Sequence, residues 1–170
     1  MKFKALVVAA ATSIVAMGLT TGAQAIDQKP VLSLDMANKI VEACVAKAAA
    51  EGWRPVNVAV YDDGGNLKAF QRMDNAFLGS IQVAQLKGHS STMFPFPTRV
   101  FAELAYGKDG EPGPIPGIAE VPGIAAFAGG VPIMTADGQQ LGGVGVSGAS
   151  SDEDEMCAQA GIEAIADMMQ

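Results

Sequence analysis

The strongest constraint on the fold is an alternating run that stops at a tight turn and then resumes. Val56, Val58 and Val60 alternate with residues of different character, which is the period of a strand with one buried side. The sequence DDGGN at 62–66 follows, and its residues tolerate the left-handed backbone of a hairpin turn. Residues 67–73 are predicted to form the returning strand. An antiparallel hairpin is therefore expected, which favours an α+β fold.

Three helices are predicted around this hairpin. Ser33 is expected to cap the first, because apolar residues between 34 and 48 repeat with helical spacing. The second is expected over about 78–92, where it stops before a proline. The third begins at Ser150, which has a glutamate three residues later, the pattern of a capping box. Helices thus bracket the predicted strands along the chain.

Further strands are predicted in the second half of the chain. Residues 124–127, 131–135 and 140–147 have strand character, and they are separated by Gly129-Gly130 and by an Asp-Gly turn at 137–138. Together with the hairpin they make five strands. The expected architecture is a five-stranded antiparallel sheet flanked by helices.

The first 25 residues have the organisation of a secretory signal peptide. A basic start is followed by an apolar run over 5–19 and by Ala-Gln-Ala at 23–25. That run is shorter than the roughly 20 residues of a membrane-spanning helix, so cleavage after Ala25 is expected. The mature chain, 26–170, has the size of a single domain. We expect this domain to work in the periplasm or outside the cell.

The charge of the chain excludes one class of partner. There are 18 acidic and 11 basic residues, which gives a formal net charge of −7. Nucleic acid and anionic membrane surfaces repel such a chain. The basic residues are scattered singly, so no nucleic-acid-binding stripe is formed.

The two cysteines, Cys44 and Cys157, do not have the spacing of a zinc or redox motif. Both fall on apolar faces of predicted helices, so buried free thiols are the default expectation. A disulfide is the alternative, because export makes one chemically accessible. The acidic run at 152–155 is explained by the positive end of a helix dipole rather than by a calcium site. No metal site is assigned.

Three segments, in this order, carry a resemblance to a known family. They are VAVYDDGGNLKAFQRMD at 58–74, GGVPI at 129–133 and DGQQLGGVGVSG at 137–148. In order and spacing they resemble the GlcG/HbpS family, which includes the C-terminal domain of PduO-type corrinoid adenosyltransferases. The resemblance covers the chain from Leu32 onward. It implies a profilin-like layered sandwich and subunits that assemble into symmetric homo-oligomers.

The same resemblance implies that the protein binds haem. The segment KGHSSTMFPFPTRVF at 87–101 is similar to the stretch that carries the haem contact in HbpS-like members. By that similarity Thr98 matches the coordinating threonine. His89 stands where HbpS-like members have an aromatic hydroxyl residue, so no role is carried over to it.

Haem needs an apolar slot, an axial donor to iron and cations for its two propionates. The region offers candidates for each need. The apolar candidates are Phe94, Phe96, Phe101 and Met93, the axial candidates are His89, Thr98, Met93 and Tyr106, and the cations are Lys87 and Arg99. Each has an ordinary structural explanation too, such as core packing, helix capping or a hydrogen bond. No CxxCH motif is present, so haem is expected to bind non-covalently.

Two other functions remain open from the residues alone. A small-metabolite enzyme would need an acid–base pair, for which only His89 with Asp74 or Glu103 qualifies, and no catalytic residue is assigned. A structural oligomer would use the Pro/Gly-rich stretch at 93–122 for subunit contacts. For a haem binder, the expected role is sequestration or sensing, with a membrane sensor or an exported enzyme as partner.

Overall fold

The computed structural model describes residues 29–169, so the predicted signal peptide lies outside the described residues. One four-stranded antiparallel sheet, in the order β2-β1-β4-β3, forms the centre. The elements in chain order are α1 (Leu34–Ala50), β1 (Asn57–Asp62), β2 (Leu67–Arg72), α2 (Ser80–Met93), α3 (Thr98–Tyr106), the 3-10 helix η1 (Pro116–Glu120), β3 (Gly130–Met134), β4 (Gln140–Ser147), α4 (Ser151–Glu163) and the 3-10 helix η2 (Ala166–Met168).

The β1–β2 hairpin confirms the first prediction from the sequence. Its turn is held by the Asp62 carboxylate, which accepts hydrogen bonds from the backbone N–H groups of Gly64 (3.0 Å) and Asn66 (2.9 Å). Gly65 has φ of +75°, a conformation that favours glycine. Local sequence therefore determines this turn.

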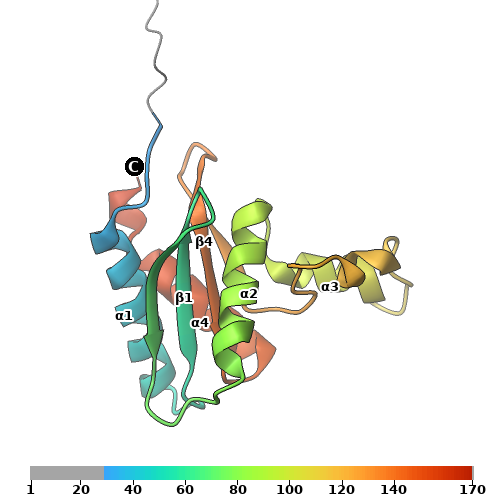
Figure 1. Cartoon of the computed structure of the whole chain (residues 1–170), viewed down its shortest axis with the longest axis horizontal. Helices are drawn as coiled ribbons and strands as arrows, with labels where there is room; N and C mark the ends of the chain where they lie inside the picture. Colours follow the sequence, from blue (N-terminus) through green and yellow to red (C-terminus); the bar gives the residue numbers. More distant parts are fainter. Residues whose placement is uncertain (1–28, 170) are drawn as a thin grey trace, which may run out of the picture.

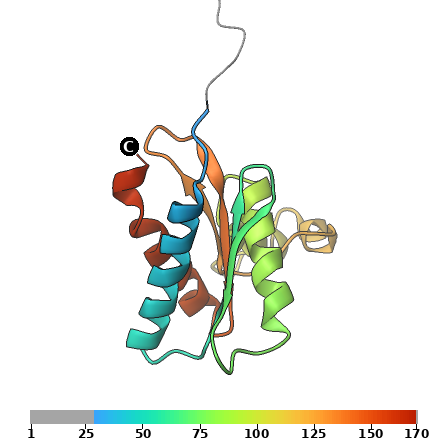
Figure 2. The ribbon, with the colours of Figure 1, turned by 60° about the vertical axis from the view of Figure 1, so that its left-hand side comes forward.

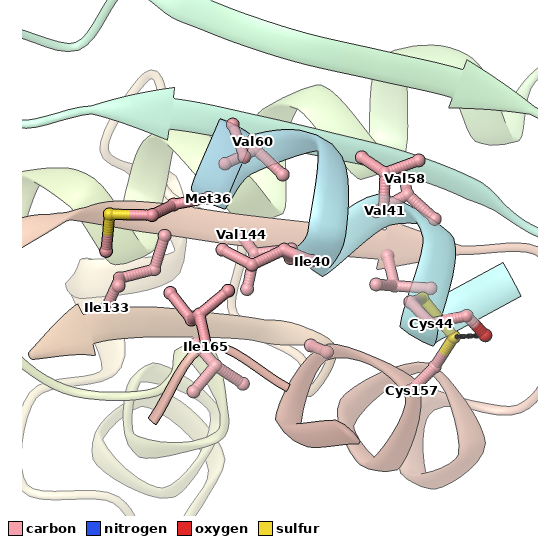
Figure 3. Close-up of a cluster of buried hydrophobic side chains, with 14 of the residues drawn as sticks. Met36, Ile40, Val41, Cys44, Val58, Val60, Ile133, Val144, Cys157 and Ile165 are labelled. Carbon is pink, nitrogen blue, oxygen red and sulfur yellow. Dashed lines mark hydrogen bonds between the residues drawn. A yellow bond between two sulfur atoms is a disulfide. The ribbon is translucent and has the colours of Figure 1, made fainter. Parts of the chain in front are cut away.

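Helices cover both faces of the sheet (Figures 1 and 2). On one face α1 and α4 pack against the valines of β1 and β4, such as Val58, Val60 and Val144 (Figure 3). On the other face α2 packs over β1 and β4, where Ala84 contacts Ala59 and Tyr61. The alternation along β1 thus divides its side chains between two helical layers.

The close packing of α2 on the sheet depends on glycine in β4. A Cβ on Gly145 would lie 2.1 Å from the carbonyl oxygen of Ala84 and from the backbone nitrogen of Gly88. Neither backbone atom can move without moving the helix. Glycine at this position therefore sets how near α2 lies to the strands.

The prediction of five strands was wrong, because 124–127 does not join the sheet. The backbone N–H of Ala125 instead donates to the Ser90 hydroxyl on α2 (2.9 Å). The oxygen of that hydroxyl lies 2.8 Å from the carbonyl oxygens of Gly123 and of Leu86, the two acceptors available to its one proton. The segment's apolar residues resemble those of a strand, but a helix side chain takes the place of a neighbouring strand.

The default expectation of free thiols was also wrong. Cys44 on α1 and Cys157 on α4 form a disulfide, with Cα atoms 4.7 Å apart and both side chains fully buried (Figure 3). The two helices approach closely because Gly161 has no side chain, and a Cβ there would lie 2.7 Å from the carbonyl oxygen of Ile40. The disulfide therefore joins two helices that already pack together.

Candidate functional site

The segment predicted to contact haem runs from α2 into α3 through a short connection, residues 93–98, which we call the joint. α2 ends at Met93 because Pro95 and Pro97 cannot continue a helix. Phe94 is extended (φ −138°, ψ 138°), and α3 starts directly after Pro97. The prolines therefore turn the chain away from the sheet at this point.

Three phenylalanines cluster at the joint. The ring centroids of Phe94, Phe96 and Phe101 are 5.0 to 5.7 Å apart. Phe101 is 1% exposed, whereas Phe94 is 36% exposed and the neighbouring Met93 is 60% exposed. The joint therefore presents an apolar aromatic surface to solvent, supported from behind by a buried ring.

Thr98 is fully buried beneath this surface. Its hydroxyl donates to the carbonyl of Phe127 (2.7 Å) and accepts from the N–H of Gly130 (2.9 Å). A Cβ on Gly130 would lie 2.5 Å from the Thr98 methyl group. In this arrangement Thr98 fastens α3 to the start of β3, and its one hydroxyl proton is already used.

Lys87 is buried in an ion pair. Its Nζ donates to the Asp154 carboxylate on α4 (2.8 Å) and to the carbonyl of Val146 (3.0 Å). Gly129 provides the space, because a Cβ there would lie 2.6 Å from this Nζ. Burial lowers the pKa of Lys87 and raises that of Asp154, and the attraction within the pair opposes both shifts. The ammonium group thus links α2 to α4 and is directed away from the surface.

Arg99 is also engaged within the chain. Its Nε lies 3.2 Å from the Glu155 carboxylate, and its Nη2 donates to Asp152. These hydrogen bonds raise the pKa of Arg99, and the one that it donates to Asp152 has the largest effect. The sequence prediction missed the partner of Lys87, Asp154, and the two partners of Arg99, Asp152 and Glu155. Capping and the helix dipole had already explained acidic residues at the start of α4. The chain has 18 acidic and only 11 basic residues, and this excess of acids was the signal that Lys87 and Arg99 would form ion pairs within the chain.

His89 lies on the side of α2 that faces β1 and is not part of the joint. Its ring makes an edge contact with Tyr61 on β1, with centroids 5.9 Å apart. It also faces the β1–β2 turn near Gly65. Glu103, one of its two predicted acid–base partners, forms an ion pair with Lys108 instead (2.8 Å). The structure therefore divides the nine haem-site candidates between five places. Lys87 is in a buried ion pair, Arg99 is in a surface ion pair, His89 is on the β1 side of α2, Tyr106 is exposed at the end of α3, and the other five, Met93, Phe94, Phe96, Thr98 and Phe101, lie at the joint.

Five surface hollows of about 320 to 660 Å³ lie mostly away from these candidates. Tyr106 lines one of the five, beside residues 107–112, and the other eight candidates line none of them. Within residues 29–169, no group of three or more His, Cys, Asp or Glu side chains is arranged to hold a metal ion. No helix in that part of the chain is long and apolar enough to span a membrane.

Comparison with known proteins gives a family match. Residues 32–163 match the family described as "Haem degrading protein HbpS-like". The chain is 33% identical to protein GlcG of Escherichia coli K12 over 119 residues, which is 70% of this chain and 83% of GlcG. It is 29% identical to an uncharacterised 15.0 kDa protein of Citrobacter freundii, with 81% and 94% of the two chains covered.

Solved structures share the fold. HbpS superposes with a TM-score of 0.71 at 35% identity, covering 82% of this chain and 93% of that one. A double mutant of Streptomyces reticuli HbpS gives a TM-score of 0.69 at 35% identity, with 91% and 97% covered. A structure described as a PduOC:haem complex gives a TM-score of 0.69 at 26% identity, with 80% and 96% covered.

Proposed function

The chain belongs to the HbpS-like family, and from that membership we propose that it is an exported, self-assembling protein that binds haem non-covalently. One observation carries the proposal. The chain shares its fold, over nearly the whole length of the compared chain, with a domain whose structure is described as a haem complex. When bound, haem supplies iron-centred ligand and redox chemistry, and the protein supplies the slot that holds it.

The joint is the part of this chain that fits the porphyrin. A porphyrin face needs apolar contacts, and the rings of Phe94 and Phe96, tilted by 39° to each other, offer them beside the exposed Met93. The Met93 thioether is the iron-binding type of group that stands most exposed there. Thr98, which the family resemblance assigns to iron, is fully buried, so its hydroxyl oxygen reaches iron only if the packing around it opens.

The predicted cations fit the propionates less well. Lys87 is buried against Asp154, and Arg99 already has two carboxylate partners. Propionates at the joint therefore face solvent or compete with Asp152 and Glu155 for one guanidinium. Surface binding of moderate affinity is the expected consequence.

Haemin titration of the mature protein tests the proposal. We expect a shifted Soret band that saturates, and we expect Phe96→Ala to weaken haemin binding about tenfold or more because it removes apolar contact area. Met93→Leu keeps the apolar volume but removes the sulfur, so it changes the spectrum only if sulfur is axial. Met156→Ala on α4, also an exposed methionine, is the matched control and should bind as the parent does.

Two further variants separate the remaining candidates. His89→Ala should leave the spectrum unchanged if haem sits at the joint, because His89 packs beside Tyr61 instead. Arg99→Ala should weaken binding less than Phe96→Ala, since its guanidinium is already paired. Removal of the Thr98 hydroxyl is a poor first test, because it leaves the buried N–H of Gly130 and the part-buried carbonyl of Phe127 without this partner. No Soret shift, or equal binding by the joint variants, would reject the site.

Export and self-assembly form the second part of the proposal. The disulfide supports an oxidising compartment, where such bonds persist. Exposed apolar side chains such as Tyr106 and Ile115 support contacts between subunits. N-terminal sequencing of protein from its native compartment should begin at or near Ile26, and sedimentation at micromolar concentration should give a mass above one chain. A full-length N-terminus or a monomer mass would reject the corresponding claim.

Haem degradation is a second candidate function, favoured by the wording of the family description. The haemin-loaded protein should then lose its Soret band over time when ascorbate and oxygen are supplied. Haemin on serum albumin under the same conditions is the control. If the Soret band is lost at the same rate from both proteins, degradation is rejected and haem binding is the only function of the two that stays proposed.

A further inference from the structure

One of the five hollows lies at the end of the sheet where β1 begins and β4 ends. Its volume is about 370 Å³, and it is lined by Arg54, Pro55, Asn75, Phe77 and Gly148. None of these residues belongs to the joint. Because this size lies within the usual range for small-molecule sites, the hollow is large enough for a compact organic ligand.

The wall of the hollow is held in place by hydrogen bonds from the sheet. Arg72 at the end of β2 donates to the carbonyl of Ala76 (2.8 Å), and the Asn57 amide donates to the carbonyl of Phe77 (3.3 Å). Asn75 adopts φ of +64°, a left-handed conformation that turns the chain directly before these two anchored carbonyls. The loop that carries Phe77 is therefore preorganised, which reduces the entropy lost on binding.

Arg54 gives the hollow a cation without an ionic partner. Among the described residues no carboxylate lies within 4 Å of its guanidinium, although the chain is strongly acidic. Its guanidinium carbon lies 5.4 Å from the Phe77 ring centroid, a cation–π contact. Glu153 acts on it electrostatically, but the Glu153 carboxylate accepts from the backbone N–H and hydroxyl of Ser150. The Arg54 guanidinium thus lies beside an aromatic ring while its donors remain available.

A buried polar atom lies behind the same wall. Asn57 is fully buried, and in the part of the chain that the structure describes its Oδ1 has no hydrogen-bond partner. Its amide nitrogen holds Phe77, which lines the hollow. Unpaired buried acceptors are rare in folded proteins and recur at functional sites. The unpaired Oδ1 of Asn57 is therefore a second, independent indication that this hollow is a functional site.

We propose that this hollow binds a small organic carboxylate with a flat apolar body. The carboxylate pairs with the forked donors of Arg54, since guanidinium and carboxylate match in geometry. The apolar body packs against the Phe77 ring and Pro55, two surfaces that would otherwise face water. The site is separate from the joint, so it does not depend on haem binding.

Benzoate is the probe that tests this assignment, and benzyl alcohol is its neutral counterpart. In a titration followed by amide NMR, benzoate should shift the signals of Asn75, Phe77 and Gly148 in a saturable way. A ligand of this size is expected to have a dissociation constant of roughly 1 mM. Benzyl alcohol should bind at least about tenfold more weakly, because it lacks the charge that Arg54 recognises.

Variants decide whether Arg54 and Phe77 are responsible. Arg54→Gln should weaken benzoate binding about tenfold, and Phe77→Ala should weaken it several-fold. Lys39→Gln on α1 makes the same change of charge outside the hollow and should have no effect. Haemin binding by Arg54→Gln should equal that of the parent. Equal binding of benzyl alcohol, an unchanged affinity in Arg54→Gln or the absence of saturable shifts would each overturn the proposal.

Discussion

Two regions of the molecule are stabilised in different ways. The body consists of the sheet with α1, α2 and α4, and its core draws side chains from distant parts of the chain. The arm consists of residues 94–127 with α3 and η1, which extend to the right of α2 in Figure 1. Its small core has only three buried members, Phe101, Ala105 and Ala126.

The difference separates stability from exposure. The body carries the disulfide and the buried Lys87–Asp154 pair, both of which join elements far apart in sequence. The arm and the adjoining end of α2 carry exposed apolar side chains such as Met93, Tyr106 and Val121. The surface proposed for haem and for subunit contacts thus extends from a body whose stability does not depend on it. Substitutions in one region are therefore expected to leave the structure of the other unchanged.

The largest effect is expected from removing the disulfide. Cys44 and Cys157 are 113 residues apart, so the chain-entropy relation gives about 4.7 kcal/mol of stabilisation for a loop of roughly this length. The double substitution Cys44→Ser with Cys157→Ser should lower the free energy of unfolding by about that amount in urea denaturation. The parent protein with a reductant should show the same loss. An unchanged midpoint in both would mean that the body does not depend on this bond.

The next effect concerns the buried ion pair. Lys87→Met leaves the Asp154 carboxylate buried and unpaired, so the free energy of unfolding should fall by roughly 3 to 5 kcal/mol. Adding Asp154→Leu removes the unpaired charge and should recover most of that loss. Denaturation of both variants checks the pair. If the double variant is no better than the single one, the pair is not the source of the loss.

A cavity in the arm should act locally. Phe101→Ala removes the buried ring of the aromatic cluster, which typically destabilises the surrounding packing by about 3 kcal/mol. We expect faster limited proteolysis within 94–127, while unfolding of the body in urea changes little. Phe94→Ala, at a partly exposed ring, is the control and should have a smaller effect. A full loss of global stability in Phe101→Ala would show that arm and body unfold together.

The smallest effect is expected at the capping box of α4. Ser150→Ala removes the hydroxyl that accepts from the Glu153 N–H, and the free energy of unfolding should fall by about 1 kcal/mol. The Ser150 backbone N–H holds the pKa of Glu153 below its usual value. A lowered folded-state pKa means that this stabilisation is present above the ordinary pKa of 4.5 and is lost as pH falls through the lowered value.

That pH dependence is open to a direct check. Denaturation between neutral and acidic pH should show a shallower loss of stability in Glu153→Gln than in the parent, since glutamine does not titrate. Ser150→Ala keeps the backbone N–H and should therefore retain part of the slope. If stability depends on pH equally in the parent and in Glu153→Gln, the Glu153 carboxylate does not contribute to this pH dependence.

Local patterns in the sequence determined the turns and helix caps that are held by contacts between residues close together in the chain. The DDGGN turn, the Ser33 cap and the Ser150–Glu153 capping box were predicted and are present, because each rests on contacts between residues at most four apart. The three co-linear motifs likewise led to the family, which the match over 32–163 confirms. The haem site residues stay predictions.

Only the tertiary structure decided which distant groups meet. It placed 124–127 against Ser90 instead of a fifth strand, and it joined Cys44 to Cys157. It also paired Lys87 and Arg99 with acids on α4 and turned His89 toward β1, away from the joint. Such outcomes depend on the distance between helices and on where glycines allow close approach. Periodicity along a chain specifies which face of a helix is apolar, but not which distant element will cover each side chain.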